Sequence, residues 1–265
     1  RQRQMCIRDR VETVWGMRQL YGFTASGHSH YALTGSFFNS GPYAGYLAMI
    51  LPICLYHYLR VPEKWRYLCK SLKIEKITAA VAGMLILCVL PSTMSRSAWI
   101  AAAISCIWVA YMYRDKRKWN ILWRRYKKRY ILWGAGIFLI LSLAAAGMFF
   151  LKSDSALGRL FMWKMTCRAI AAHPWGCHTG FACAYGGAQS LYFASGNYAA
   201  WEERVAGSPE YAFNEYLEFA LTYGIVMCIL ALFVIFGCLW IGVRLRRYGV
   251  CGALISCLLY TSPSP

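Results

Sequence analysis

The feature that most constrains this chain is a series of five apolar segments, each close to the length that a helix needs to cross a bilayer. A helix rises about 1.5 Å per residue, so roughly 20 residues cover the hydrocarbon layer. Because lipid cannot satisfy backbone polar groups, each segment has to form its own hydrogen bonds. The sequence therefore predicts an all-α fold, a polytopic bundle of transmembrane helices. The expected spans are residues 43–59, 77–94, 97–113, 130–151 and 214–243.

The basic residues predict the orientation of these spans. The chain has a formal net charge of +18, although only 15% of its residues are charged. Most lysines and arginines gather in three connections, 60–76, 114–129 and 244–247. Alternating spans place all three on one side, which the positive-inside pattern identifies as the cytoplasm. Nucleic acid is not expected as a partner, because the charges flank apolar segments instead of lining one basic face.

The longest connection, residues 152–213, then lies on the extracytoplasmic side. It is a large loop rich in glycine and aromatic residues. Membrane spans are usually joined by short connections, so a loop of this length is typical of a working surface.

The two ends of the chain are expected to be foreign to the protein. Residues 1–10 and 257–265 back-translate onto the two arms of a transposase sequencing adapter. We exclude both from fold reasoning and expect residues 11–256 to be one membrane domain, a fragment open at both ends.

Two arginines near the predicted membrane surface are candidates for binding an anion. Arg96 stands in PSTMSRSAW at the outer turn between two spans, and Arg159 stands in GRLFMWKM after the fourth span. A guanidinium binds phosphate through paired hydrogen bonds. Both could instead anchor the chain at lipid headgroups. Arg159, Trp163 and Ile170 are compatible with a short amphipathic helix on the membrane, to which Arg168 adds charge.

Two further stretches carry polar groups. In HPWGCHTGF, His173 is a possible general base, and Gly176 and Gly180 allow a tight turn and close backbone approach to a ligand. No standard zinc spacing is met, so no metal is expected.

The second stretch, SPEYAFNEYLEFALTYGI, opens the last span, and the candidate cap of its helix is Ser208 with Glu210, or a residue near it. Asn214 and Glu218 share a helix face, with Glu215 adjacent. The alternative for this cluster is a plain capping and anchoring role.

Together these segments resemble the O-antigen ligase and polymerase family of bacterial inner-membrane glycosyltransferases. The matching stretches are TGSFFNSGPYAGYLA, which contains Asn39, then MSRSAW, GRLFMWKMTCRAIAAHPWGCHTGF and SPEYAFNEYLEFALTYGI. They occur in the family's order across about residues 11–243.

The resemblance implies a multi-pass inner-membrane protein whose periplasmic loop covers the site. Such an enzyme transfers a glycan from a polyprenyl-diphosphate carrier to a hydroxyl of lipid A-core, another glycan or a protein. By motif, Arg96 and Arg159 would bind the diphosphate and stabilise its departure. Asn214 and Glu215 would position the acceptor, and no cofactor is implied. The loop would bind glycan and acceptor, and the substrate-binding candidates are Asn39, Trp163, Arg168, Gly176, Gly180, Glu210 and Glu218.

One position departs from the family pattern. Ligases carry a His-Asn pair where this chain has Phe213 and Asn214, followed by Gly224. Phenylalanine cannot accept a proton, so His173, His178, Glu210 and Glu215 remain the candidate bases. A polymerase or a protein glycosyltransferase of the same family is an alternative to a ligase.

A lipid-linked glycan flippase is the alternative from another functional class. It would be expected to carry polar groups at mid-span, and these segments hold almost none.

Overall fold

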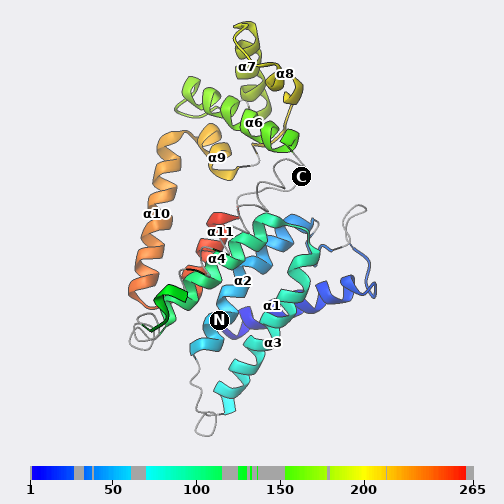
Figure 1. Cartoon of the computed structure of the whole chain (residues 1–265), viewed down its shortest axis with the longest axis vertical. Helices are drawn as coiled ribbons and strands as arrows, with labels where there is room; N and C mark the ends of the chain where they lie inside the picture. The colour runs from blue at the N-terminus through cyan, green and yellow to red at the C-terminus, as the bar shows by residue number, and fades with distance from the viewer. Residues whose placement is uncertain are drawn as a thin grey trace. The chain divides into compact units, whose positions relative to one another are not determined.

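The structure is a computed structural model that describes residues 2–26, 33–37, 39–60, 70–114, 125–129, 132, 136, 153–177, 180–212 and 214–260. None of these residues lies in a strand, so the all-α prediction is confirmed for the described part of the chain (Figure 1). Contacts divide the chain into two units. Unit 1 comprises residues 1–113 and 232–265, and unit 2 comprises residues 114–231.

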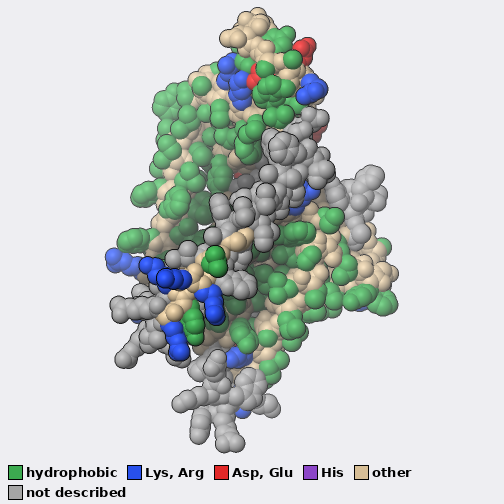
Figure 2. All heavy atoms as spheres, in the orientation of Figure 1, with side chains coloured by type: hydrophobic (Ala, Val, Ile, Leu, Met, Phe, Trp, Pro, Cys, Tyr) green, Lys and Arg blue, Asp and Glu red, His purple; other side chains and the backbone are tan. Residues whose placement is uncertain are grey.

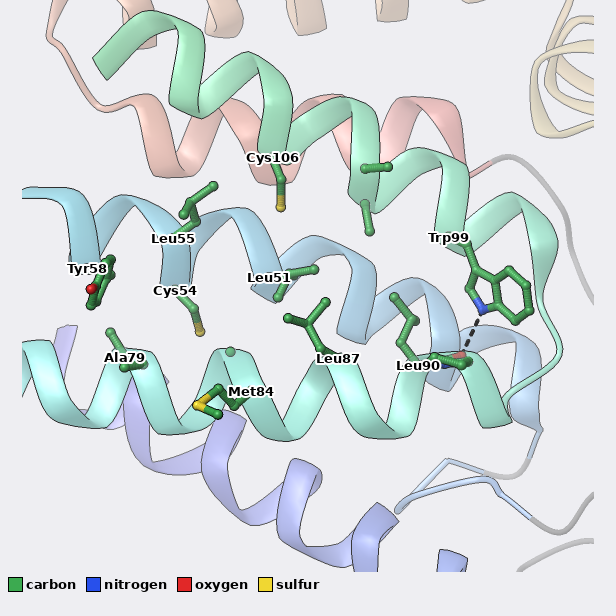
Figure 3. A pocket seen from close by; sticks show the side chains of 15 residues that line it. Leu51, Cys54, Leu55, Tyr58, Ala79, Met84, Leu87, Leu90, Trp99 and Cys106 are labelled. Atoms are coloured by element: carbon green, nitrogen blue, oxygen red, sulfur yellow. Dashed lines mark hydrogen bonds between the residues drawn. The ribbon is translucent and has the colours of Figure 1, made fainter. Parts of the chain in front are cut away.

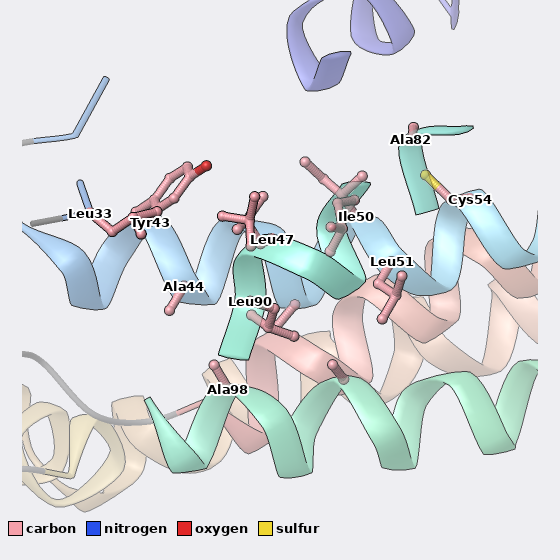
Figure 4. Close-up of a cluster of buried hydrophobic side chains, with 14 residues drawn as sticks. Leu33, Tyr43, Ala44, Leu47, Ile50, Leu51, Cys54, Ala82, Leu90 and Ala98 are labelled. Atoms are coloured by element: carbon pink, nitrogen blue, oxygen red, sulfur yellow. The ribbon is translucent and has the colours of Figure 1, made fainter. Parts of the chain in front are cut away.

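In unit 1 the central element is helix α2, Ser40–Arg60, which packs against three other helices. These are α3 (Lys70–Ser92), α4 (Arg96–Tyr113) and α11 (Tyr248–Leu259). A further helix, α1 (Gln2–Leu20), packs against α3. Side chains from α2, α3 and α4 form the buried core, including the fully buried Tyr43 and Leu47 (Figure 4).

Small residues bring α11 close to its neighbours. A side chain carbon at Gly252 would lie 2.6 Å from Val109 on α4 and 2.9 Å from Pro52 on α2. One turn further on, the buried Ser256 hydroxyl donates to the Ala48 carbonyl at 2.8 Å. Glycine and serine at such spacing let helix backbones approach closely, which is how helices pack in a membrane, where the hydrophobic effect gives little attraction.

Three chain segments with basic connections meet at one end of unit 1. The Tyr113 hydroxyl, at the end of α4, donates to the Arg60 carbonyl at the end of α2 (3.4 Å). Tyr56 donates to the Arg246 carbonyl between α10 and α11 (3.2 Å) and packs edge-on against Tyr113 and Tyr248. The basic connections therefore leave the bundle at a shared end, as alternating spans require.

Unit 2 is built around helix α6, Ser153–Ala172. Helices α7 (Phe181–Ala194), α8 (Ala200–Val205) and α9 (Glu215–Tyr223) pack against it. Its buried core includes Phe161, Met165, Tyr185 and Leu221. The region predicted as a large loop thus contains three helices in its described part, since α6, α7 and α8 all lie within residues 152–213.

A buried carboxylate ties three of these helices together. Glu202 of α8 is 3% exposed. It accepts hydrogen bonds from Lys164 of α6 (2.5 Å), the Tyr192 hydroxyl of α7 (2.7 Å) and the Ala199 amide (3.0 Å). Burial alone would raise the pKa of Glu202, but the hydrogen bonds from Lys164, Tyr192 and Ala199 outweigh it and lower the pKa to about 2. A fully bonded buried charge of this kind holds its helices in one arrangement.

The predicted spans agree with the helices in part. Residues 43–59, 77–94 and 97–113 fall mainly in α2, α3 and α4, and 130–151 lies outside the described residues except for 132 and 136. By length and composition, Leu72–Ser92 of α3 and the helix α10, Ile225–Arg244, could cross a membrane. Full polytopic insertion stays a prediction.

One predicted span is two helices. The segment 214–243 is interrupted at Gly224, whose φ of 90° lies in a region that favours glycine, and α9 and α10 meet there. Of the candidate caps, neither Ser208 nor Glu210 caps the helix. The cap is Asn214, whose side chain accepts from the amides of Tyr216 and Leu217 (3.0 and 3.3 Å).

We predict that Gly252→Leu destabilises unit 1 by about 1–3 kcal/mol, the usual cost of overpacking. The new side chain would clash with Val109 and Pro52. Gly237→Leu on α10 is the matched control, because a Cβ atom there would meet no atom within 4 Å. Denaturant titration of the purified protein in detergent measures the free energy of unfolding of both variants. Equal stability of the two variants would contradict the packing described.

A second prediction concerns pH. The folded pKa of Glu202, about 2, lies below the ordinary 4.5, so its ionised form stabilises unit 2 above pH 4.5 and this stabilisation is lost as pH falls towards 2. We expect amide protection factors of α8 to fall over this window. Glu202→Gln should show low protection throughout it, and the exposed Glu203→Gln should behave as wild type. Wild-type protection in Glu202→Gln would overturn the assignment.

Candidate functional site

The turn that carries Arg96 is held by one backbone carbonyl. Leu90 O, at the end of α3, accepts from the Thr93 amide (3.2 Å), the Thr93 hydroxyl (2.7 Å) and the Trp99 indole of α4 (2.9 Å). Met94 in this turn is left-handed, with φ of 54°. Arg96 is the first residue of α4 and is exposed, and no carboxylate in the described part of the chain pairs with it. It is therefore a cation on a fixed turn, open to a ligand.

An apolar groove begins beside this turn. It lies between α2, α3 and α4, has a volume of about 630 Å³ and is partly open (Figure 3). Pro91 and Trp99 line the end near Arg96, and Tyr58 and Ala79 line the end nearest the basic connections. The walls between are almost wholly apolar, formed by Leu51, Cys54, Leu55, Ala80, Gly83, Met84, Leu87, Leu90, Ala102, Ala103 and Cys106. Such a groove suits a flexible hydrocarbon chain and no polar ligand.

Asn39, the other candidate in unit 1, performs a local task. Its side chain oxygen accepts from the Gly41 amide at 3.2 Å, at the start of α2. This is the geometry of a helix cap, which satisfies an amide that the helix itself leaves free. Its predicted role in substrate binding is not needed to explain its position.

Three candidates of unit 2 stand on α6 in different surroundings. Arg159 is exposed, near the start of the helix. Trp163 is half-buried, and among the described residues its buried indole nitrogen has no hydrogen-bond partner. The Arg168 guanidinium lies 4.3 Å from the centre of the Tyr192 ring, a cation–π contact. Ile170, expected on the same membrane-facing side as Arg159 and Trp163, is buried in the core of unit 2.

The turn after α6 packs tightly against the break between α9 and α10. The Cys177 amide donates to the Leu221 carbonyl (2.7 Å), and the Ile225 amide donates to the Pro174 carbonyl (3.0 Å). A side chain carbon on Gly176 would lie 2.7 Å from the Thr222 carbonyl oxygen, and one on Gly224 would lie 2.7 Å from the Trp175 backbone. The backbone that approaches Gly176 closely in the structure is the protein's own, and close approach to a ligand stays a prediction.

The remaining candidates of this turn region are differently placed. His173 is exposed and follows the last residue of α6. Gly180 precedes α7 with φ of 87° and ψ of 155°, a conformation open essentially to glycine alone, while a side chain there would meet open space. Its backbone conformation is therefore sufficient to explain the glycine.

The acidic candidates gather around the start of α9. Glu218 accepts from the Ala212 amide at 3.2 Å, so it fastens the preceding segment in addition to the Asn214 cap. Glu210 and Glu215 are exposed. Partial burial, followed by the nearby Glu218 carboxylate, raises the pKa of Glu215 above its ordinary value. Of these groups, Glu215 has the properties closest to those of a general base.

Sequence reasoning did not predict the Lys164–Tyr192–Glu202 cluster. Its members are 10 to 38 residues apart. The only local signal is that Glu202 stands three residues after Ala199, the spacing at which a glutamate can bond back to a helix start. Two other predicted positions, His178 and Phe213, lie outside the described residues.

Comparison with known proteins adds the family. A family model described as O-antigen ligase matches residues 79–232, more than half of the chain. The match includes most of α3, all of α4 with Arg96, and every candidate of unit 2. No curated protein and no solved structure showed significant similarity. On the strength of the family match, the chain belongs to the O-antigen ligase family, which acts in surface polysaccharide assembly.

Proposed function

We propose that this protein transfers a glycan from a polyprenyl-diphosphate carrier to an acceptor hydroxyl at the extracytoplasmic face of the bacterial inner membrane. The family supports a glycosyltransferase-like membrane enzyme of polysaccharide assembly. The donor, the acceptor and the side of the membrane are our proposal.

The observation that carries this proposal is the apolar groove that begins beside Arg96. A polyprenyl diphosphate has a long hydrocarbon chain joined to a doubly charged head. The groove offers the chain an apolar space of about 630 Å³, and Arg96 offers the head an exposed guanidinium three residues from Trp99, which lines the groove. A nucleotide-sugar donor would leave the groove unexplained, since it has no apolar chain.

The chemistry requires one bond to form and one to break. The acceptor oxygen attacks the anomeric carbon of the glycan, and the bond from that carbon to the diphosphate oxygen breaks. The electron pair leaves with the carrier diphosphate, whose growing negative charge Arg96 would stabilise. Arg159 is assigned the same task through its family motif in α6.

The acceptor hydroxyl loses its proton in this reaction, and either a basic side chain or water accepts that proton. Glu215 fits this role best among the described candidates, because it is exposed and its pKa is raised. Asn214 and Glu218, which are occupied in holding α9, would then act by keeping Glu215 in place. His173 is the second candidate and is also exposed.

We predict that Arg96→Ala lowers the rate of glycan transfer about 100-fold or more, the usual effect of removing a group that stabilises developing charge. The transfer rate of Arg96→Lys should lie between those of Arg96→Ala and wild type, because lysine retains the charge but cannot form the paired hydrogen bonds. Arg60→Ala is the control, because Arg60 ends α2 two residues after Tyr58, which lines the end of the groove away from Arg96. The assay uses purified full-length protein and polyprenyl-linked glycan with lipid A-core, glycan or protein acceptors. Transfer at the wild-type rate by Arg96→Ala in correctly inserted protein would refute the role.

We further predict that Gly83→Leu raises the KM for a long-chain donor about tenfold, which corresponds to about 1.4 kcal/mol. The new side chain would enter the groove, where its nearest neighbour is Cys54 at 3.7 Å. A donor with a shortened prenyl chain is the internal control, and its KM should change little. An equal effect on both donors would show that the groove does not hold the chain.

A further inference from the structure

The turn between α6 and α7 carries an exposed tryptophan that neither the family nor the proposed reaction explains. Trp175 is 80% exposed, although its backbone is held firmly against the break between α9 and α10. Tyr223, the last residue of α9, is 58% exposed beside the same break. A large apolar side chain on a rigid turn is costly to leave in water. It therefore indicates a surface that is covered in the working protein.

The position of this turn along the membrane normal follows from α10. That helix has 20 residues and no buried side chain, and its apolar composition makes it a candidate span. Hydrophobic side chains cover its visible face (Figure 2). At about 1.5 Å per residue, 20 residues extend about 30 Å, which is the thickness of the hydrocarbon layer. If α10 spans the membrane, its length matches the thickness of the hydrocarbon layer. Its first residue then lies at the membrane boundary.

The first residue of α10 is also the one to which the turn is attached. The Ile225 amide donates to the Pro174 carbonyl at 3.0 Å, and Gly224 abuts the Trp175 backbone. These contacts place Trp175 within one helical turn of the boundary. Arg244 ends α10 at its opposite end, so the turn lies at the end of α10 away from Arg244.

We propose that Trp175, with Tyr223, forms a membrane-interface anchor that seats the turn after α6 in the headgroup layer of the bilayer. The occupant of this surface is the boundary between headgroups and acyl chains. It is continuous with the lipid-facing surface of α10. Tryptophan and tyrosine favour this layer because one part of each ring is apolar and another is polar. The anchor does not depend on the proposed transfer reaction, although it would keep the exposed His173 at the level of lipid headgroups.

Fluorescence quenching by brominated lipids tests the anchor. The full-length protein is reconstituted in phosphatidylcholine brominated either near the carbonyl end or near the methyl end of the acyl chain. Subtracting the emission of Trp175→Phe from that of wild type isolates one of the chain's 11 tryptophans. We expect shallow bromines to quench most of this emission and deep bromines to quench less. Trp201→Phe is the matched control, because Trp201 packs against the core of unit 2 and its emission should not respond to either lipid.

Two results would overturn the anchor. One is a Trp175 emission that neither lipid quenches, which would mean that protein or water covers the side chain. The other is stronger quenching by the deep bromines, which would place Trp175 inside the hydrocarbon layer. If Trp175→Phe does not insert, Trp175→Tyr provides the same subtraction and keeps a ring suited to the interface.

Discussion

Close backbone approach at glycine is the interaction on which both units depend. In unit 1, Gly252 lets α11 lie against α2 and α4 at a distance that no side chain would allow. In unit 2, Gly176 and Gly224 bring the turn after α6 onto the break between α9 and α10, where two backbone hydrogen bonds close the contact. For helices within lipid, as predicted for unit 1, the hydrophobic effect contributes little to helix association. Van der Waals contact and hydrogen bonds between closely placed backbones therefore hold such helices together.

The candidate site in unit 1 follows from this packing. Helix α2 contacts both α3 and α4, while these two contact each other little, so a groove remains between them. The turn that joins them is held by Leu90 O, and Arg96 starts the next helix. An apolar surface and a cation therefore come together through one short connection, which is the pairing that a lipid diphosphate requires.

Several candidates turned out to have structural tasks that explain their residue type. Asn39 and Asn214 accept hydrogen bonds from amides in the first turns of α2 and α9, and Glu218 accepts one from the Ala212 amide. Asparagine and glutamate are frequent at such positions in any helix, so a motif read along the chain cannot separate capping from catalysis. Among the described candidates, Arg96, His173, Glu210 and Glu215 are exposed and have no comparable structural task.

The sequence by itself determined the helical class, most helix positions in unit 1, and the family, because apolar length, flanking charge and ordered motifs are local properties. Only the tertiary structure decided that the long connection is helical, that α9 and α10 are separate, and that Gly176 meets Gly224 and Lys164 meets Glu202. These contacts join residues 38 to 48 positions apart in the chain. Their formation depends on how helices pack, and packing is set by the shape of the whole surface, which no local pattern encodes.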